Sequence, residues 1–217
     1  MALRLVTDAT AEPVSLVEQK AWSVISTVGT VSDAVISAMI KTARRECENK
    51  TKRALMPQTW KLVFEDFPDV ITLPRPPVES SSDITIQHMD SSGGSTTMAK
   101  TSISTCRYIV DVAAEPAQIF LKGSASWPEV YDQQNAVTVT YITGYPLKST
   151  GTTGAGGSSE VPNAPENANT WIKLRAGSLF ENREGFVVAN MNQGLQETPH
   201  NFFDGLLDDL VLIEVSP

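Results

Sequence analysis

The stretch TKRALMPQTWKLVFEDFPDVITLPRPP, residues 51–77, joins a helix to a run of strands. Upstream of it, apolar residues recur at helical spacing over residues 33–53, which predicts a long amphipathic helix. Met56-Pro57 ends that helix, because proline lacks an amide hydrogen and disfavours the α conformation in the residue before it. Residues 58–64 then alternate between apolar and polar side chains, as a half-buried strand does. The chain therefore changes from helical to β structure at Pro57.

From residue 58 to residue 146 the sequence predicts β structure and no helix. Turn-forming residues, such as those at 90–94 and 122–124, separate short runs rich in β-branched and aromatic residues. The predicted strands cover residues 59–64, 70–73, 84–88, 105–110, 117–121 and 136–142. Short strands at such regular spacing favour a small antiparallel sandwich or barrel. We expect Trp60 and Leu62, on one face of the first strand, to be buried between the β domain and the helices.

Helices are predicted on both sides of the β region. Residues 15–22 form a short helix, with Ser15 and Glu18 placed as a capping box. A second long helix begins at Pro165-Glu166, and its apolar residues recur at helical spacing with one interruption at Arg175. We expect the two long helices to pair with each other. The sequence thus predicts an α+β fold, a small helical bundle with an inserted antiparallel β domain that is a sandwich or barrel-like.

The predicted domain boundaries follow from this pattern. Residues 1–57 are assigned to the N-terminal part of the bundle, with an extended lead-in at 1–11, and residues 58–148 to the inserted β domain. Residues 149–164 are predicted to be a flexible loop, because the tract STGTTGAGGSS is too polar and too rich in glycine to pack. Residues 165–217 complete the bundle and add a tail.

Composition limits the class of protein. A chain of 217 residues is long enough for one domain or two small ones. Its net charge of −8 argues against a nucleic-acid-binding surface, which needs clustered lysine and arginine. No apolar run approaches the ~20 residues of a membrane-spanning helix, and the N-terminus lacks the apolar core of a signal peptide. Cys47 and Cys106 make no disulfide framework, so we expect both to be reduced and buried in a cytosolic protein.

The sequence carries no recognisable motif for catalysis or metal binding. His88 and His200 do not stand at metal-ligand spacing with the cysteines. The glycine-rich tract lacks the Lys-Ser/Thr of a phosphate-binding loop, and no Gly-x-Ser-x-Gly elbow is present. We therefore expect no catalytic residue, no metal and no cofactor, and a role that is not enzymatic.

Several short motifs follow one another in a characteristic order. R-A-L-x-x-Q-T-W at 53–60 is followed by L-P-R-P-P at 73–77, and further pieces stand at 12–16, 43–48, 108–111, 127–128, 137–145 and 179–184. Together they resemble the head–tail connector (adaptor, or head completion) proteins of tailed bacteriophages. The resemblance covers residues 12–184. The serine run after Pro77, the glycine-rich tract and the tail after Glu184 depart from the family pattern.

This resemblance implies a structural role in the virion neck. Connector proteins form a homo-oligomeric ring, commonly a dodecamer, that docks beneath the portal protein and offers a platform to the next neck or tail-terminator protein. DNA would pass through the channel without sequence-specific binding, and an acidic lining would repel its phosphates. The protein would be assembled in the host cytoplasm, would reside at the head–tail junction, and would contact no membrane.

Two sets of residues are candidates for assembly contacts. The apolar, β-prone tail is predicted to dock on the portal by strand addition, or alternatively to pack on its own helices; it comprises Leu210, Val211, Leu212, Ile213, Glu214 and Val215. The basic half of the first long helix either forms a solvated face that suits the helix dipole, or makes charge contacts with a neighbouring subunit through Arg44, Arg45 and Arg53.

Two readings from other classes stay open at this point. One is a stand-alone β-sandwich module that binds carbohydrate or protein, and the other is a small hydrolase with a site spread over the loops. A ring-forming protein should associate with a portal, whereas a binding module should stay monomeric and hold a small ligand.

Overall fold

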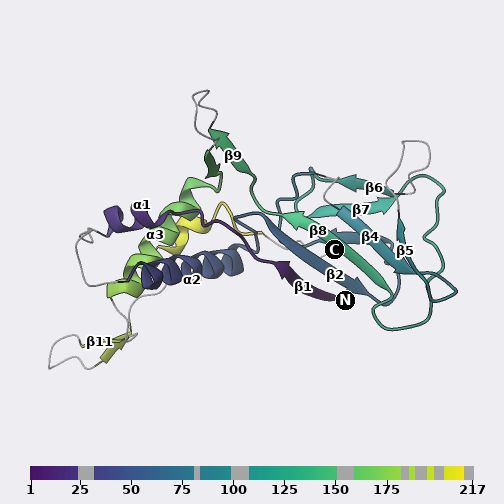
Figure 1. Ribbon diagram of the computed structural model, residues 1–217, viewed down its shortest axis with the longest axis horizontal. Coiled ribbons are helices and arrows are strands. Elements are labelled where there is room, and N and C mark those ends of the chain that lie inside the picture. The colour runs from purple at the N-terminus through teal and green to yellow at the C-terminus, as the bar shows by residue number, and fades with distance from the viewer. Residues whose placement is uncertain are drawn as a thin grey trace. The chain divides into compact units, whose positions relative to one another are not determined.

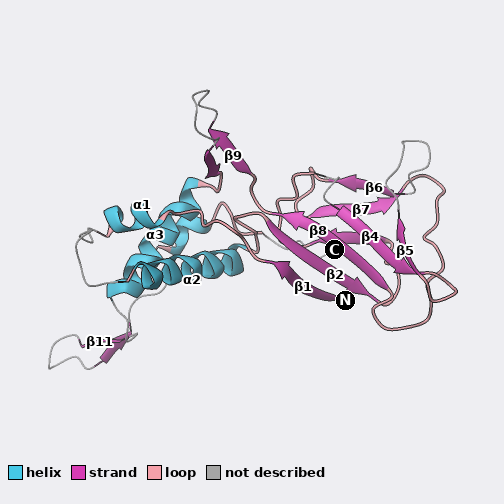
Figure 2. Ribbon diagram, viewed as in Figure 1, coloured by secondary structure: helices cyan, strands magenta, loops and turns pink. Residues whose placement is uncertain are grey.

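The computed structural model describes residues 1–23, 32–80, 84–98, 108–150, 159–181, 186–188, 195–197 and 203–212. The chain divides into two units. Unit 1 consists of Met1–Thr10 and Met56–Leu147, and unit 2 consists of Ala11–Leu55 and Lys148–Pro217. Figure 1 follows the chain through both units by colour, and Figure 2 distinguishes helices from strands. The α-helices of the described residues all belong to unit 2.

Unit 1 contains a five-stranded antiparallel sheet and a three-stranded antiparallel sheet (Figure 1). The order in the larger sheet is β1 (Ala2–Thr7), β2 (Gln58–Phe64), β8 (Val137–Thr143), β4 (Ile84–Met89) and β5 (Ser95–Met98). The order in the smaller sheet is β3 (Val70–Leu73), β7 (Ala117–Leu121) and β6 (Tyr108–Asp111).

The two sheets share one apolar core, so unit 1 is an antiparallel sandwich. Burial alternates along β4 and β8, as the pleat requires when one face of a strand is covered. The register aligns Leu62 and Ile86 with Val139 from either side. The buried cluster comprises Leu62, Ile71, Leu73, Val78, Ile84, Ile86, Tyr108, Ala117, Ile119, Val139 and Tyr141. The α+β class is confirmed, and the described strands close no barrel.

The turn L-P-R-P-P is held in place by the end of β8. The Tyr141 hydroxyl donates to the Pro74 carbonyl at 2.8 Å, and the Thr143 hydroxyl contacts the carbonyls of Arg75 and Pro77. Arg75 has a left-handed backbone (φ 64°), and its guanidinium lies 5.4 Å from the ring centroid of Trp60. The two sequence motifs that carry the connector resemblance are therefore in contact within unit 1.

Most predicted strands of unit 1 are confirmed, within two residues at each end. The exception at 105–110 is described only from Tyr108 onward, and residues 101–107 lie outside the described part of the chain. The expectation for Trp60 and Leu62 was wrong, because both pack with the core of unit 1. Leu62 is fully buried there, whereas Trp60 is partly exposed.

Two strands of unit 1 were not predicted. Residues 2–7, expected as an extended lead-in to the bundle, form β1 and pair with β2. Strand β5 is polar and exposed, so it shows no apolar alternation. Both are edge strands of the larger sheet, where one neighbouring strand supplies all the pairing.

Unit 2 is built around α1 (Leu16–Trp22), α2 (Asp33–Thr51) and α3 (Glu166–Glu181), which lie side by side in Figure 1. The capping box of α1 is present, with the Ser15 side chain accepting from the Glu18 amide at 3.2 Å. The pairing of α2 with α3 is confirmed. Their buried residues are mostly apolar and include Ile36, Ile40, Ala43 and Cys47 of α2, and Ala168, Trp171, Ile172 and Ala176 of α3.

Short β pairs and a 3-10 turn complete unit 2. β9 (Leu147–Thr150) pairs with β10 (Ser159–Pro162), so the tract expected to be flexible has ordered flanks. Its centre, residues 151–158, lies outside the described residues. β11 (Phe186–Val188) pairs with β12 (Leu195–Glu197), and the 3-10 turn η2 spans Asp204–Leu207.

Cys47 is buried in α2, as expected. Burial raises the pKa of its thiol to about 12, so the sulfur stays protonated and unreactive at neutral pH. Cys106 lies outside the described residues.

Candidate assembly surfaces

The C-terminal segment 203–212 is fastened to unit 2 at η2. The Phe203 ring meets Trp171 edge-on, with 5.5 Å between the ring centroids. The two carboxylate oxygens of Asp204 accept hydrogen bonds from Lys50 Nζ at 2.7 Å and from Trp171 Nε1 at 3.0 Å. Burial alone would raise the pKa of Asp204, but these two hydrogen bonds together with the positive charges of Lys50 and Arg175 outweigh it, and the pKa is lowered. The segment therefore starts from a fixed position.

The first residues of the predicted docking tail are bonded to the end of α2. Arg53 Nε donates to the Leu210 carbonyl at 2.7 Å, and the Leu212 amide donates to the Thr51 carbonyl at 3.2 Å. Val211, between them, has 40% of its surface exposed. The remaining tail residues, Ile213, Glu214 and Val215, lie outside the described residues. The described part of the tail therefore ends beside the C-terminus of α2, at Leu212.

Arg44 is not available for a contact between subunits. Its side chain is fully buried, with Nε 2.7 Å from Glu12 Oε2 and Nη1 2.9 Å from Glu48 Oε2. Glu48 also accepts the Leu55 amide at 3.0 Å, which ties the end of α2 to the same network. This corrects the expectation for Arg44, because its charge is already neutralised inside unit 2.

The other two candidate arginines differ from Arg44 and from each other. Arg53 is partly buried and holds the tail through Leu210, as described above. Arg45 is exposed on α2. Its role in such a contact stays a prediction.

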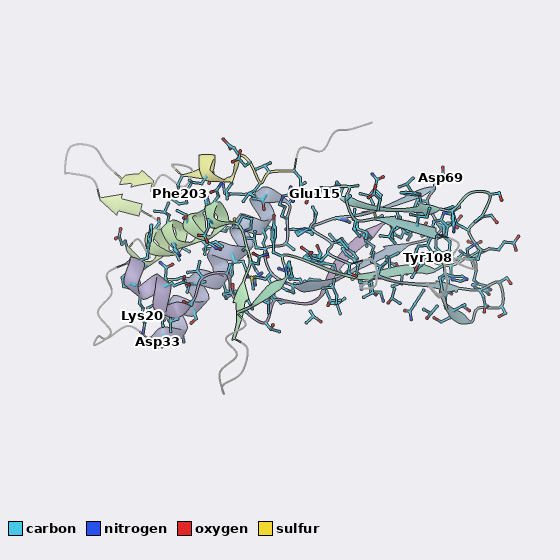
Figure 3. All side chains as sticks on the ribbon, turned by 90° about the horizontal axis from the view of Figure 1, so that it is seen from above. Lys20, Asp33, Asp69, Tyr108, Glu115 and Phe203 are labelled. Carbon is cyan, nitrogen blue, oxygen red and sulfur yellow. The ribbon has the colours of Figure 1, made fainter. Side chains whose placement is uncertain are left out.

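Ion pairs also join α2 to the other helices. Arg175, the residue that interrupts the apolar pattern of α3, forms a bidentate pair with Glu46 of α2, with Nε–Oε2 at 2.5 Å and Nη2–Oε1 at 3.1 Å. Lys20 of α1 and Asp33 of α2 approach to 2.5 Å and lie together in Figure 3. The charges of α2 thus serve mainly to hold its own unit together.

A separate feature is a cleft of about 970 Å³ in unit 1. It is lined by residues 65–67, which follow β2, and residues 127–134, which precede β8. Trp127 stacks on Phe67 with ring centroids 4.6 Å apart and an angle of 4° between the planes. Sequence reasoning missed this cleft, because its two loops are about sixty residues apart and meet only once β2 pairs with β8.

The described residues contain no group of three or more His, Cys, Asp or Glu side chains that could hold a metal ion. His88 is buried on β4, and burial lowers its pKa. Within the described part of the chain, no helix is both long enough and apolar enough to span a membrane.

Comparison with known proteins defines the class of fold. No family model matches the sequence, and no curated protein sequence matches it. Solved structures do match, and the similar chains come from the neck or the virion of gene transfer agent (GTA) particles.

Three such chains are similar along the whole length. A chain from the neck of an empty GTA particle, computed with C6 symmetry, has 21% identity and a TM-score of 0.69. A chain from the virion of the native GTA particle has 17% identity and a TM-score of 0.67, and one from the native neck, computed with C12 symmetry, has 19% and 0.66. Each similarity covers 100% of this chain and 98% of the other, so the fold is shared from end to end.

Proposed function

We propose that this protein is a structural component of the neck of a tailed phage or phage-like particle, where it acts as the head-to-tail connector. The observation that carries the proposal is the end-to-end fold similarity to neck chains, at TM-scores of 0.66–0.69. A fold made of two units in a fixed order is a more specific likeness than a β-sandwich alone. The proposed role is structural and involves no catalysis.

In this proposal, copies of the chain form a closed ring, a dodecamer, beneath the portal protein. The C6 and C12 symmetry of the similar neck assemblies supports a ring. Ring closure needs two different surfaces on each copy, and the exposed Arg45 on α2 is the candidate charge contact at one of them. The face of the ring that points away from the portal would bind the next neck or tail-terminator protein. Assembly would take place in the host cytoplasm.

The net charge of −8 suits a channel through which DNA slides. An acidic wall repels the phosphates and prevents the tight, salt-dependent binding that clustered arginines would give. No sequence-specific DNA contact is proposed.

The apolar tail is proposed to dock on the portal by adding a strand to it. Its apolar residues are an aggregation hazard unless another surface covers them. Leu210 and Leu212 are already bonded to unit 2, so the proposed docking element is narrowed to the residues from Ile213 onward. The bonds at Arg53 and Thr51 would set the point from which this element reaches its partner.

A truncation after Leu212 tests the function and the tail together. We expect the truncated protein to melt like the full chain and to form rings, but not to join portal-containing heads, as counted by electron microscopy. The matched control replaces residues 213–217 with Gly-Ser-Gly-Ser-Gly, which keeps the length and removes the apolar side chains, and it should fail in the same way.

The outcomes distinguish the docking role of the tail from the connector function of the whole protein. If the truncated chain still joins heads, the docking role of the tail is lost but the neck function survives. If the full chain neither forms rings nor binds heads, the connector function itself is wrong. Arg45→Glu is expected to weaken ring formation while the monomer stays folded, as checked by circular dichroism.

A further inference from the structure

The acidic cleft of unit 1 is formed where two loops meet at one end of the larger sheet. β2 and β8 are antiparallel neighbours, and Phe64 at the end of β2 pairs with Val137 at the start of β8. The loops at 65–67 and 127–134 therefore lie against each other at that end. The connections between the units leave the opposite end of the sheet, near Thr59 and Thr143. The cleft is thus clear of the chain connections.

The charge of the cleft has one sign. Its lining includes four exposed carboxylates, from Glu65, Asp66, Glu129 and Asp132, and the described lining contains no lysine or arginine. The Asp66 carboxylate accepts the Phe67 amide at 2.7 Å, which fixes the first loop. Like charges gathered around a concavity focus a negative potential, and this attracts a cation.

Aromatic rings form the other part of the lining. The Phe67–Trp127 stack packs against the apolar core. The His88 ring is not part of the lining, and it lies tilted to Phe67 with 5.8 Å between the ring centroids. Two buried nitrogens here, Trp127 Nε1 and His88 Nδ1, have no hydrogen-bond partner among the described residues. Tyr131 leaves 45% of its surface exposed at the rim. Aromatic faces beside carboxylates suit lysine and arginine side chains, which bind through both charge and cation–π contact.

We propose that this cleft binds a cationic segment, bearing lysine and arginine, of a different protein chain. A volume of about 970 Å³ accommodates several side chains rather than a single ion, and the described carboxylates form no metal-binding group. A second copy of this chain is a poor occupant, because it carries a net charge of −8 itself. A carbohydrate is disfavoured, because Phe67 covers one face of Trp127 and four carboxylates remain without a counter-charge in the lining. The inference does not depend on the connector function.

The test uses the full chain and the peptide acetyl-Gly-Lys-Gly-Arg-Gly-Lys-amide, with the same peptide carrying glutamate at the three charged positions as its counterpart. Indole N–H resonances in a ¹H–¹⁵N spectrum report binding, and Trp127→Phe assigns the signal of Trp127. We expect the cationic peptide to shift the Trp127 resonance and to leave those of Trp22, Trp60 and Trp171 unchanged. Raising the salt concentration should weaken binding several-fold, because the carboxylates are exposed to solvent.

A pair of matched variants separates the cleft from the overall negative charge. A quadruple variant that neutralises the cleft should bind the cationic peptide at least tenfold more weakly. It carries Glu65→Gln, Asp66→Asn, Glu129→Gln and Asp132→Asn. The control makes the same charge change at exposed sites outside the cleft, through Glu79→Gln, Glu166→Gln, Asp208→Asn and Asp209→Asn, and should stay within twofold of the parent.

Three results would overturn the proposal. The first is an equal loss of binding in both quadruple variants, which would show a non-specific effect of net charge. The second is a Trp127 shift that appears with protein concentration alone, which would make a second copy the occupant. The third is a Trp127 shift with a neutral oligosaccharide and none with the cationic peptide.

Discussion

Unit 1 and unit 2 are stabilised by different interactions. Unit 1 buries an apolar cluster between two sheets, and most of its internal links are backbone ladders. Unit 2 buries apolar residues of α2 and α3 and adds ion pairs that connect segments distant in the sequence. These pairs are Glu12–Arg44, Lys20–Asp33, Glu46–Arg175 and Lys50–Asp204. The pairs are specific in geometry, so in unit 2 charge contributes, with apolar packing, to which elements meet.

The difference has a physical origin. A sandwich covers one face of each sheet completely, so apolar burial at about 25 cal/mol per Å² accounts for its cohesion. In unit 2, α1 is only seven residues long, which limits the apolar surface that it can cover. The segment around Glu12 and the segment 203–212 are therefore held to the helices by ion pairs as well. Unit 2 should therefore respond to acid and to the loss of a single charge far more than unit 1.

The largest expected effect is that of Arg44→Met. Removing the guanidinium leaves Glu48 buried without its counter-charge, which should cost roughly 3–5 kcal/mol of unit 2 stability in urea denaturation. The control is Arg45→Met on the next, exposed position, expected to cost below about 0.5 kcal/mol. Equal costs for the two variants would show that the buried network does not hold unit 2 together.

An intermediate effect is expected for Asp204→Asn, which removes the ion pair with Lys50 but keeps an acceptor for Trp171. The cost should be about 1 kcal/mol at pH 7, because the pair is partly exposed. The pKa of Asp204 is lowered in the folded chain. Its contribution to the stability of unit 2 is therefore complete when the pH is above the ordinary pKa of a carboxyl group, and is lost as the pH falls through the lower pKa of the folded state. The variant should therefore lose less stability than the parent on acidification below about pH 4. A parallel acid profile for both proteins would contradict this assignment.

The smallest effect is expected in unit 1, at His88. Its pKa is lowered by burial, so the folded state favours the neutral ring. The contribution of His88 to the stability of unit 1 is therefore complete above about pH 6.5. As the pH falls below that value, the unfolded chain takes up the proton first and unit 1 loses stability. His88→Gln should remove this slope between pH 6.5 and pH 5, as measured by amide hydrogen exchange on β8. A slope that persists in the variant would place the titrating group elsewhere.

Features that depend on neighbouring residues were predicted well from the sequence. Features that depend on pairing between distant segments were not. The capping box, the proline at residue 57 and the alternation along β2, β4 and β8 act within a few residues, so they can be read from the sequence. β1 could not be predicted, because its strand conformation depends on pairing with β2 more than fifty residues away. The acidic cleft has the same dependence on β2 and β8.

For the candidate assembly residues, the sequence indicated some features of their environment but not their interaction partners. Arg44 shares the helical stripe of Ile36, Ile40 and Cys47, so its burial could have been inferred from spacing, whereas its partner Glu12 could not. Arg45 falls one position off that stripe and is exposed. For the tail, composition indicated an apolar segment, but only the structure places Leu210 and Leu212 against α2.

The way the chain alternates between the units sets an order of events during synthesis. Unit 1 is complete once residue 147 has been made, whereas unit 2 needs α3 and η2, which lie in the 70 residues 148–217. At typical elongation rates, this leaves about 4–14 s during which the apolar stripe of α2 can pack on α1 but not on α3. The sandwich can close in that interval, so the ribosome would hold a finished β unit attached to an exposed helix. Translation speed over residues 148–207 would set how long this surface of α2 stays exposed.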